Sequence, residues 1–186
     1  MQATITEKEL LKECLAGKPR AQYELYDRYV GAMYNTAIRM MASAVEAEDV
    51  LQEGFAKVFQ QLHTFRGEST IGAWIKRIIV TTALTHLRNK KKFQVVELNV
   101  VADLEDEEAE EEAPLWDAKT IHYAIQELPE GCRVVFNLFL IEGMQHKEIA
   151  EALGITESTS KTQYMRAKKL LRERLKALRF GGLETR

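Results

Sequence analysis

The chain has 186 residues, of which 46% are hydrophobic, so it can bury one sizeable core or two small ones. Its 26 basic and 28 acidic residues nearly balance, yet residues 93–117 hold ten acids and no Lys or Arg. The rest of the chain therefore has 26 basic against 18 acidic residues, a formal net charge of +8. This separation of positive from negative charge along the chain favours a nucleic-acid partner.

Cysteine use and apolar runs exclude several classes of protein. Cys14 and Cys132 lie far apart and outside any CxxC or Cys/His cluster, which argues against a disulfide framework or a zinc site. The N-terminus has neither a basic n-region nor a long apolar h-region, and no run of about 18 apolar residues occurs. We therefore expect no metal, no cofactor and no membrane insertion, and a cytoplasmic location where both thiols stay reduced.

The first part of the chain has the periodicity of amphipathic helices. Pro19 opens a long segment in which apolar residues recur every three or four positions, namely Leu25, Tyr29, Met33, Ala37 and Met40. A second helix is predicted over 45–62. The loop HTFRGEST follows, and its hydroxyl residues can cap a third helix from about 70 to 90. That helix ends in four cations within five residues, more than its dipole needs.

Residues 93–117 interrupt this pattern. The run LEDEEAEEEA has almost nothing to bury and repels itself, so an extended or weakly helical tether is expected. A short strand over 95–101 is an alternative for its first part. The predicted organisation is therefore a domain over 1–92, an acidic linker over 93–117 and a second domain over 118–186.

The second domain is also predicted to be helical. Helices fit 117–127, 130–142, 146–153 and 156–178. In HKEIAEALGITES, the small apolar face of one helix precedes Gly154, which supplies a turn, and Thr156, a good N-cap for the next helix. This spacing is that of a helix-turn-helix.

The last predicted helix has two different faces. Its inward side is expected to hold Ser160, Tyr164, Ala167, Leu171 and Leu178. Its outward side carries Ser158, Lys161, Thr162, Met165, Arg166 and Lys169. The outward set mixes cations for phosphate with groups that can meet base edges in a major groove. The alternative is a surface helix kept soluble by its charges, with Gly154 acting only as a C-cap.

These segments together resemble the extracytoplasmic-function sigma factors of bacterial RNA polymerase. AEDVLQEGFAKVF (47–59), FRGEST (65–70) and IGAWIKRIIVTTALTHLRNKKK (71–92) are similar to the family's region 2. Residues 127–175 are similar to region 4. The resemblance implies an all-α protein of two small helical domains that binds core RNA polymerase, recognises promoter DNA and carries out no chemistry itself.

The resemblance also implies roles for single residues. It assigns polymerase binding to Asp49, Gln52 and Glu53, and recognition of the minus 35 element to the outward residues of 156–178, above all Lys161, Thr162, Met165 and Arg166. It assigns contacts with the minus 10 element to Phe65, Arg66, Gly67, Lys76, Arg77, Arg88 and Lys90. Phe65 can equally well close the core of its domain. Thr81, Thr85 and Gln163 depart from the residues that the family often has.

The implied partners are core polymerase, promoter DNA and an anti-sigma factor. The acidic linker would thread toward the RNA exit path, either as an RNA mimic or as a passive spacer. Two other functions are compatible with parts of the chain. One is a helix-turn-helix regulator that binds an operator without polymerase. The other is a metal-dependent nuclease using the DLEDEE carboxylates, for which the sequence offers no rigid scaffold and no histidine ligand spacing.

Overall fold

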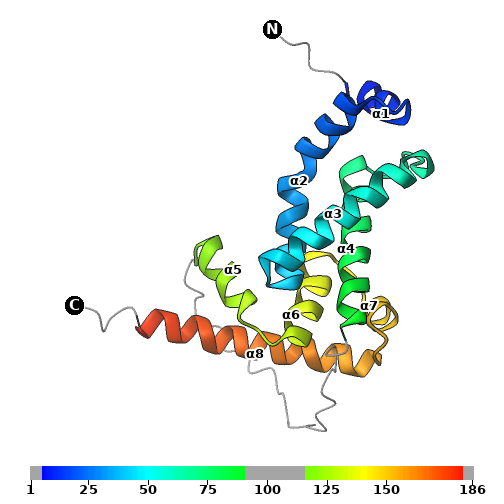
Figure 1. Cartoon of the computed structure of the whole chain (residues 1–186). Coiled ribbons are helices and arrows are strands. Elements are labelled where there is room, and N and C mark those ends of the chain that lie inside the picture. Colours follow the sequence, from blue (N-terminus) through cyan, green and yellow to red (C-terminus); the bar gives the residue numbers. More distant parts are fainter. Residues whose placement is uncertain (1–5, 91–115, 182–186) are drawn as a thin grey trace. The chain divides into compact units, whose positions relative to one another are not determined.

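The computed structural model describes residues 6–90 and 116–181, with side chains as far as 178. Every regular element within these ranges is helical, as predicted (Figure 1). The chain forms two compact units, Met1–Leu87 and Arg88–Arg186, and each is described by itself. The acidic linker and the possible strand over 95–101 lie outside the described residues, so the domain limits stay predictions.

Unit 1 contains four α-helices and one short 3-10 turn. They are α1 (Glu7–Leu15), α2 (Pro19–Met41), α3 (Ala44–Gln61), the 3-10 turn η1 (Leu62–Thr64) and α4 (Ile71–Asn89), which runs two residues past the boundary at Leu87 and is described with unit 1. The predicted helices over 45–62 and 70–90 are confirmed within one or two residues. None of the described helices is long and apolar enough to cross a membrane.

Helix α1 was not among the predicted elements. Thr6 begins it with a capping box, in which the backbone N–H of Thr6 donates to the Glu9 carboxylate at 3.1 Å. Leu10 and Cys14 are buried on the side of α1 that packs against α2. The pattern Thr-x-x-Glu just before an apolar residue was the sequence signal for this start.

Helices α2 and α3 pack together along their length, with a sharp turn between them. Ala42 takes a left-handed conformation with φ of 53°, and Ser43 then caps α3. Helix α4 approaches both of the others at glycines. A side chain at Gly54 of α3 would collide with Ile79 of α4, which is fully buried. These close contacts set the position of α4.

Unit 2 is built around one long helix. Its elements are α5 (Ala118–Gln126), α6 (Glu130–Phe136), the π-helix η2 (Asn137–Ile141), α7 (His146–Leu153) and α8 (Glu157–Gly181). The helix predicted over 130–142 is present but changes from α to π geometry after Phe136. A π segment of this kind shifts the residues that follow it around the helix axis.

One apolar cluster in the core of unit 2 lies between α5, α6 and α8. Its buried members are Ile125, Leu128, Cys132, Phe136 and Ala167. Burial falls along α8, from Ala167 at 0% exposed, through half-buried Leu171, to Leu178 at 41% exposed. The prediction that Leu178 faces inward is therefore wrong, because the covering helices end before α8 does.

Both cysteines are free and buried, one in each unit. Burial raises the pKa of the Cys14 and Cys132 thiols. A raised pKa lowers the thiolate fraction near neutral pH. The prediction of packed, unpaired thiols is confirmed, and both are poor nucleophiles in the folded chain.

The close approach of α3 and α4 predicts opposite effects for the same change at two helical glycines. Gly54→Leu should destabilise unit 1 by about 1–3 kcal/mol, since the new side chain overpacks the core at Ile79. Gly31→Leu should stabilise by about 0.5–1 kcal/mol, because nothing lies within 4 Å of its added Cβ and leucine favours a helix. Urea denaturation of both variants measures the difference. Equal effects would contradict the packing described here.

Candidate nucleic-acid and protein interfaces

The turn between α7 and α8 is held by caps on both sides. Gly154 ends α7 in the left-handed region with φ of 70°, which a residue with a Cβ adopts only at a cost. Thr156 begins α8, and its hydroxyl oxygen accepts from the backbone N–H of Thr159 at 3.0 Å. Ile149 and Leu153 are buried against α8 as predicted. The helix-turn-helix is therefore confirmed.

His146, at the start of α7, joins three elements. Its ring stacks on Phe139 of η2 with centroids 4.2 Å apart, and Nδ1 lies 3.0 Å from the Ser160 hydroxyl of α8. Tyr164 meets the same ring edge-on at 5.8 Å. Burial, with a smaller contribution from Lys161, lowers the pKa of His146 and favours its neutral form. This ring fixes the start of α7 against α8.

The outward face of α8 is largely open to solvent. Five of its predicted members, Ser158, Lys161, Thr162, Arg166 and Lys169, are exposed, and Met165 is half-buried. Lys161 pairs with Glu157 at 2.7 Å, one turn earlier. Because both groups of that pair are about half exposed, a DNA phosphate could replace Glu157 as the partner of Lys161 at little cost in free energy. The face therefore combines available cations with hydroxyl and thioether groups.

Gln163 lies on the other side of α8 from these residues. It is 7% exposed, and its Oε1 accepts from the Cys132 thiol at 3.0 Å. Its side chain also packs against Gly131. At a position where the family often has arginine, this chain has a buried polar contact, so Gln163 is unavailable for reading DNA.

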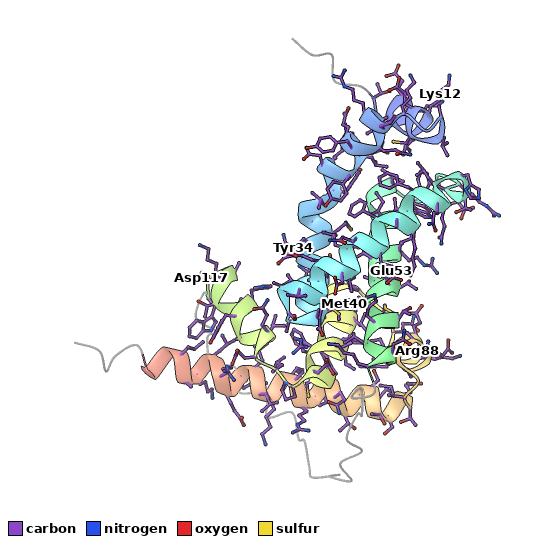
Figure 2. The ribbon with its side chains drawn as sticks, viewed as in Figure 1. Lys12, Tyr34, Met40, Glu53, Arg88 and Asp117 are labelled. Atoms are coloured by element: carbon purple, nitrogen blue, oxygen red, sulfur yellow. The ribbon has the colours of Figure 1, made fainter. Side chains whose placement is uncertain are left out.

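Two of the three predicted polymerase contacts on α3 are exposed. Asp49 and Gln52 are open to solvent. Glu53, which is labelled in Figure 2, is held by Lys57 and His86 within unit 1. Gln52 borders an open groove of about 470 Å³ between α2 and α3. The groove is lined by Tyr26, Val30, Gly31, Tyr34, Glu48, Leu51 and Gln52. Its aromatic and aliphatic walls with polar groups at one side suit a protein partner.

The loop ahead of α4 is partly packed into unit 1. The Phe65 ring is half-buried and lies 5.6 Å from the Trp74 ring, between centroids. Arg66 and Gly67 are exposed, and Gly67 has a φ of 74°. Phe65 thus supports the loop, and a base stacked there would extend the Phe65–Trp74 pair.

Helix α4 presents a row of polar groups to solvent. Arg77, Thr81, Thr85 and Arg88 are exposed, whereas Lys76 and Lys90 are half-buried. The Thr81 hydroxyl donates to the backbone carbonyl of Arg77 at 2.8 Å, and Thr85 does the same to Thr81 at 2.9 Å. With their protons used inside the helix, these threonines offer only acceptor oxygens to a partner.

The described residues contain no group of three His, Cys, Asp or Glu side chains that could hold a metal. The DLEDEE carboxylates considered for a nuclease lie outside the described ranges. His122, one of the four histidines, is instead hydrogen-bonded to Gln126 one turn along α5, at 2.9 Å.

Family comparisons agree with this two-part organisation. Residues 25–93 match the family described as Sigma-70 region 2, and residues 118–171 match Sigma-70, region 4. The RNA polymerase sigma-H factor of Pseudomonas aeruginosa is 30% identical over 92% of this chain and 95% of its own length. The ECF RNA polymerase sigma factor SigW of Bacillus subtilis is 28% identical over 92% of this chain and 97% of its own length.

A solved structure has the same fold. The sigma factor RpoE from Bartonella quintana, crystallised with the anti-sigma factor NepR, aligns with a TM-score of 0.50 at 21% identity. The alignment covers 83% of this chain and 96% of that one. Matches to both sigma regions do not favour an operator-binding regulator that works without polymerase. The chain belongs to the extracytoplasmic-function sigma factors, which direct RNA polymerase to promoters.

Proposed function

We propose that the two units divide the work of promoter recognition. Unit 2 reads the minus 35 element through the outward face of α8. Unit 1 binds core polymerase through α3 and contacts the minus 10 element through α4 and the loop before it. The observation that carries this proposal is the helix-turn-helix, which leaves the cationic face of α8 exposed while its other face is buried.

The two kinds of residue on α8 have different parts in this recognition. Lys169, Lys161 and Arg166 supply charge for phosphates or for guanine edges. Thr162 and Met165 supply short contacts to bases. The Thr162 hydroxyl donates to the Ser158 carbonyl at 3.0 Å, so its oxygen remains an acceptor for a base amino group.

On unit 1, Asp49 and Gln52 are the proposed polymerase contacts. Each is exposed, and within the described part of the chain neither side chain forms a hydrogen bond or ion pair. A partner therefore gains their interactions without breaking existing ones. Around α4, the proposed minus 10 contacts are the two exposed arginines, Arg77 and Arg88, with Arg66 and Gly67 in the loop, Phe65 beneath them, and Lys76 and Lys90 at the margins.

The proposal includes a cytoplasmic location and a mechanism without bond chemistry. Binding free energy from separated DNA contacts would be spent on opening the duplex. An anti-sigma factor is a further proposed partner, because the similar RpoE was solved with one.

Loss of the polymerase contacts should separate core binding from folding. Asp49→Ala combined with Gln52→Ala should weaken binding to core RNA polymerase by about 10-fold to 100-fold, as expected for two interface side chains. The melting temperature should stay within a few degrees, since both side chains are exposed. Fluorescence anisotropy with labelled protein and sigma-free core measures the affinity. The matched control is Lys12→Ala, an exposed change on α1, and wild-type affinity in the double variant would refute the assignment.

The face of α8 should contain both sequence-dependent and sequence-independent contacts. Lys169→Ala should weaken holoenzyme binding to all promoters alike and reduce the salt dependence by about one counterion. Arg166→Ala should cost about 1–3 kcal/mol on promoters with the preferred minus 35 element and much less on promoters with a scrambled one. Salt titrations of holoenzyme binding to both duplexes measure this. Equal losses on the two duplexes would show that Arg166 contacts only phosphate.

A further inference from the structure

A compact polar cluster joins α3 to α4 on one side of unit 1. His86 Nε2 of α4 lies 2.5 Å from one carboxylate oxygen of Glu53, and Lys57 Nζ lies 2.6 Å from the other. Lys57 also donates to the Thr82 hydroxyl at 3.3 Å. These four side chains thus form a polar bridge, in which Glu53 and Lys57 of α3 contact His86 and Thr82 of α4.

The carboxylate of Glu53 is fully engaged within the unit. Hydrogen bonds from Lys57 and then from His86 lower the pKa of Glu53, so it is ionised near neutral pH. The side chain of His86 is 29% exposed and that of Glu53 is 42% exposed. The bridge therefore lies at the edge of the core. Water there reduces the strength of its hydrogen bonds, but these bonds still fix the geometry of the groups that they join.

The bridge acts on the helix that carries the proposed minus 10 contacts. Thr82 is buried and His86 half-buried on the side of α4 toward α3, while Thr81, Thr85 and Arg88 are exposed. A rotation of α4 about its axis would move all three exposed groups together. Packing at Gly54 and Ile79 restricts the middle of α4, and His86 restricts it near its C-terminal end, about one and a half turns beyond Thr81.

We propose that His86 is a positioning residue for promoter opening, which holds the exposed face of α4 in register through its hydrogen bond to Glu53. This inference rests on the proposed contact of α4 with the minus 10 element. His86 itself does not need to touch DNA. Its effect should appear in the opening of the duplex and not in the affinity for core polymerase.

Two substitutions of His86 separate positioning from space filling. His86→Phe keeps an aromatic ring of similar size and removes the donor. His86→Gln removes the ring and places an amide N–H where Nε2 lies, so that it can still donate to Glu53. If the hydrogen bond matters, the glutamine variant should work and the phenylalanine variant should fail.

The experiment measures open complexes with core polymerase on a promoter fragment that the wild-type protein transcribes, with a fluorescent base analogue in the minus 10 element. His86→Phe should reduce the opening rate about fivefold, and His86→Gln should stay within about twofold of wild type. Core affinity should be unchanged in both. Glu13→Gln, which breaks the comparable surface pair of Glu13 with Lys18 at 2.7 Å, is the control and should open promoters normally.

Hydrogen exchange on the free protein tests the same inference without polymerase. Amides in the last two turns of α4 should exchange at least threefold faster in His86→Phe than in His86→Gln, with α1 unchanged. If wild type opens no promoter while this difference is present, the proposed function fails and the positioning of α4 stands. Equal opening and equal exchange in the two His86 variants, or failure of the glutamine variant alone, would overturn the inference.

Discussion

Burial of one face of α8 is the constraint on which the DNA-facing geometry of this protein depends. Ser160, Gln163 and Ala167 are buried at successive turns, each against a different neighbour. Ser160 meets His146, Gln163 meets Cys132, and Ala167 enters the apolar core. With the inner face specified in this way, the rotation of α8 about its axis is set, and so is the group of side chains that it presents to a partner.

In unit 1, the exposed face of α4 is likewise determined by the contacts of its buried face, although those contacts are of a different kind. Two close approaches at glycine, Gly54 to Ile79 and Gly72 to Tyr29, bring α4 against its neighbours through apolar contacts. The hydrogen bond from His86 to Glu53 then adds a directional contact, whereas apolar packing is non-directional. In each unit, a histidine holds one side of a helix in place, and the opposite side of that helix faces a proposed partner. The histidine itself does not face that partner.

Much of the fold and the outline of the site could be predicted from the sequence. Helical periodicity, Pro19, Gly154 and Thr156 are local signals, and they located the helices and the helix-turn-helix within one or two residues, except that α8 ends three residues beyond its predicted end. The capping box at Thr6 and Glu9 is an equally local signal, from which the start of α1 could have been predicted. The outward residues of α8 followed from helical spacing, which depends only on the geometry of one helix.

The contacts between helices could not be predicted in this way. The pairing of His86 with Glu53 spans 33 residues, and that of Cys132 with Gln163 spans 31, so both depend on the packing of separate helices. Leu178 was misplaced for the same reason, because periodicity says which side a residue is on and not where its neighbours end. The change to π geometry after Phe136 likewise has no marker in the run NLFLI.

The most direct test of the sigma-factor function is a run-off transcription assay with sigma-free core RNA polymerase and a pool of genomic promoter fragments, with and without this protein. This function predicts discrete new transcripts that require the protein and whose start sites follow shared, separated minus 35 and minus 10 elements. Specific binding of the protein alone to a duplex, with no transcript from any fragment, would contradict it.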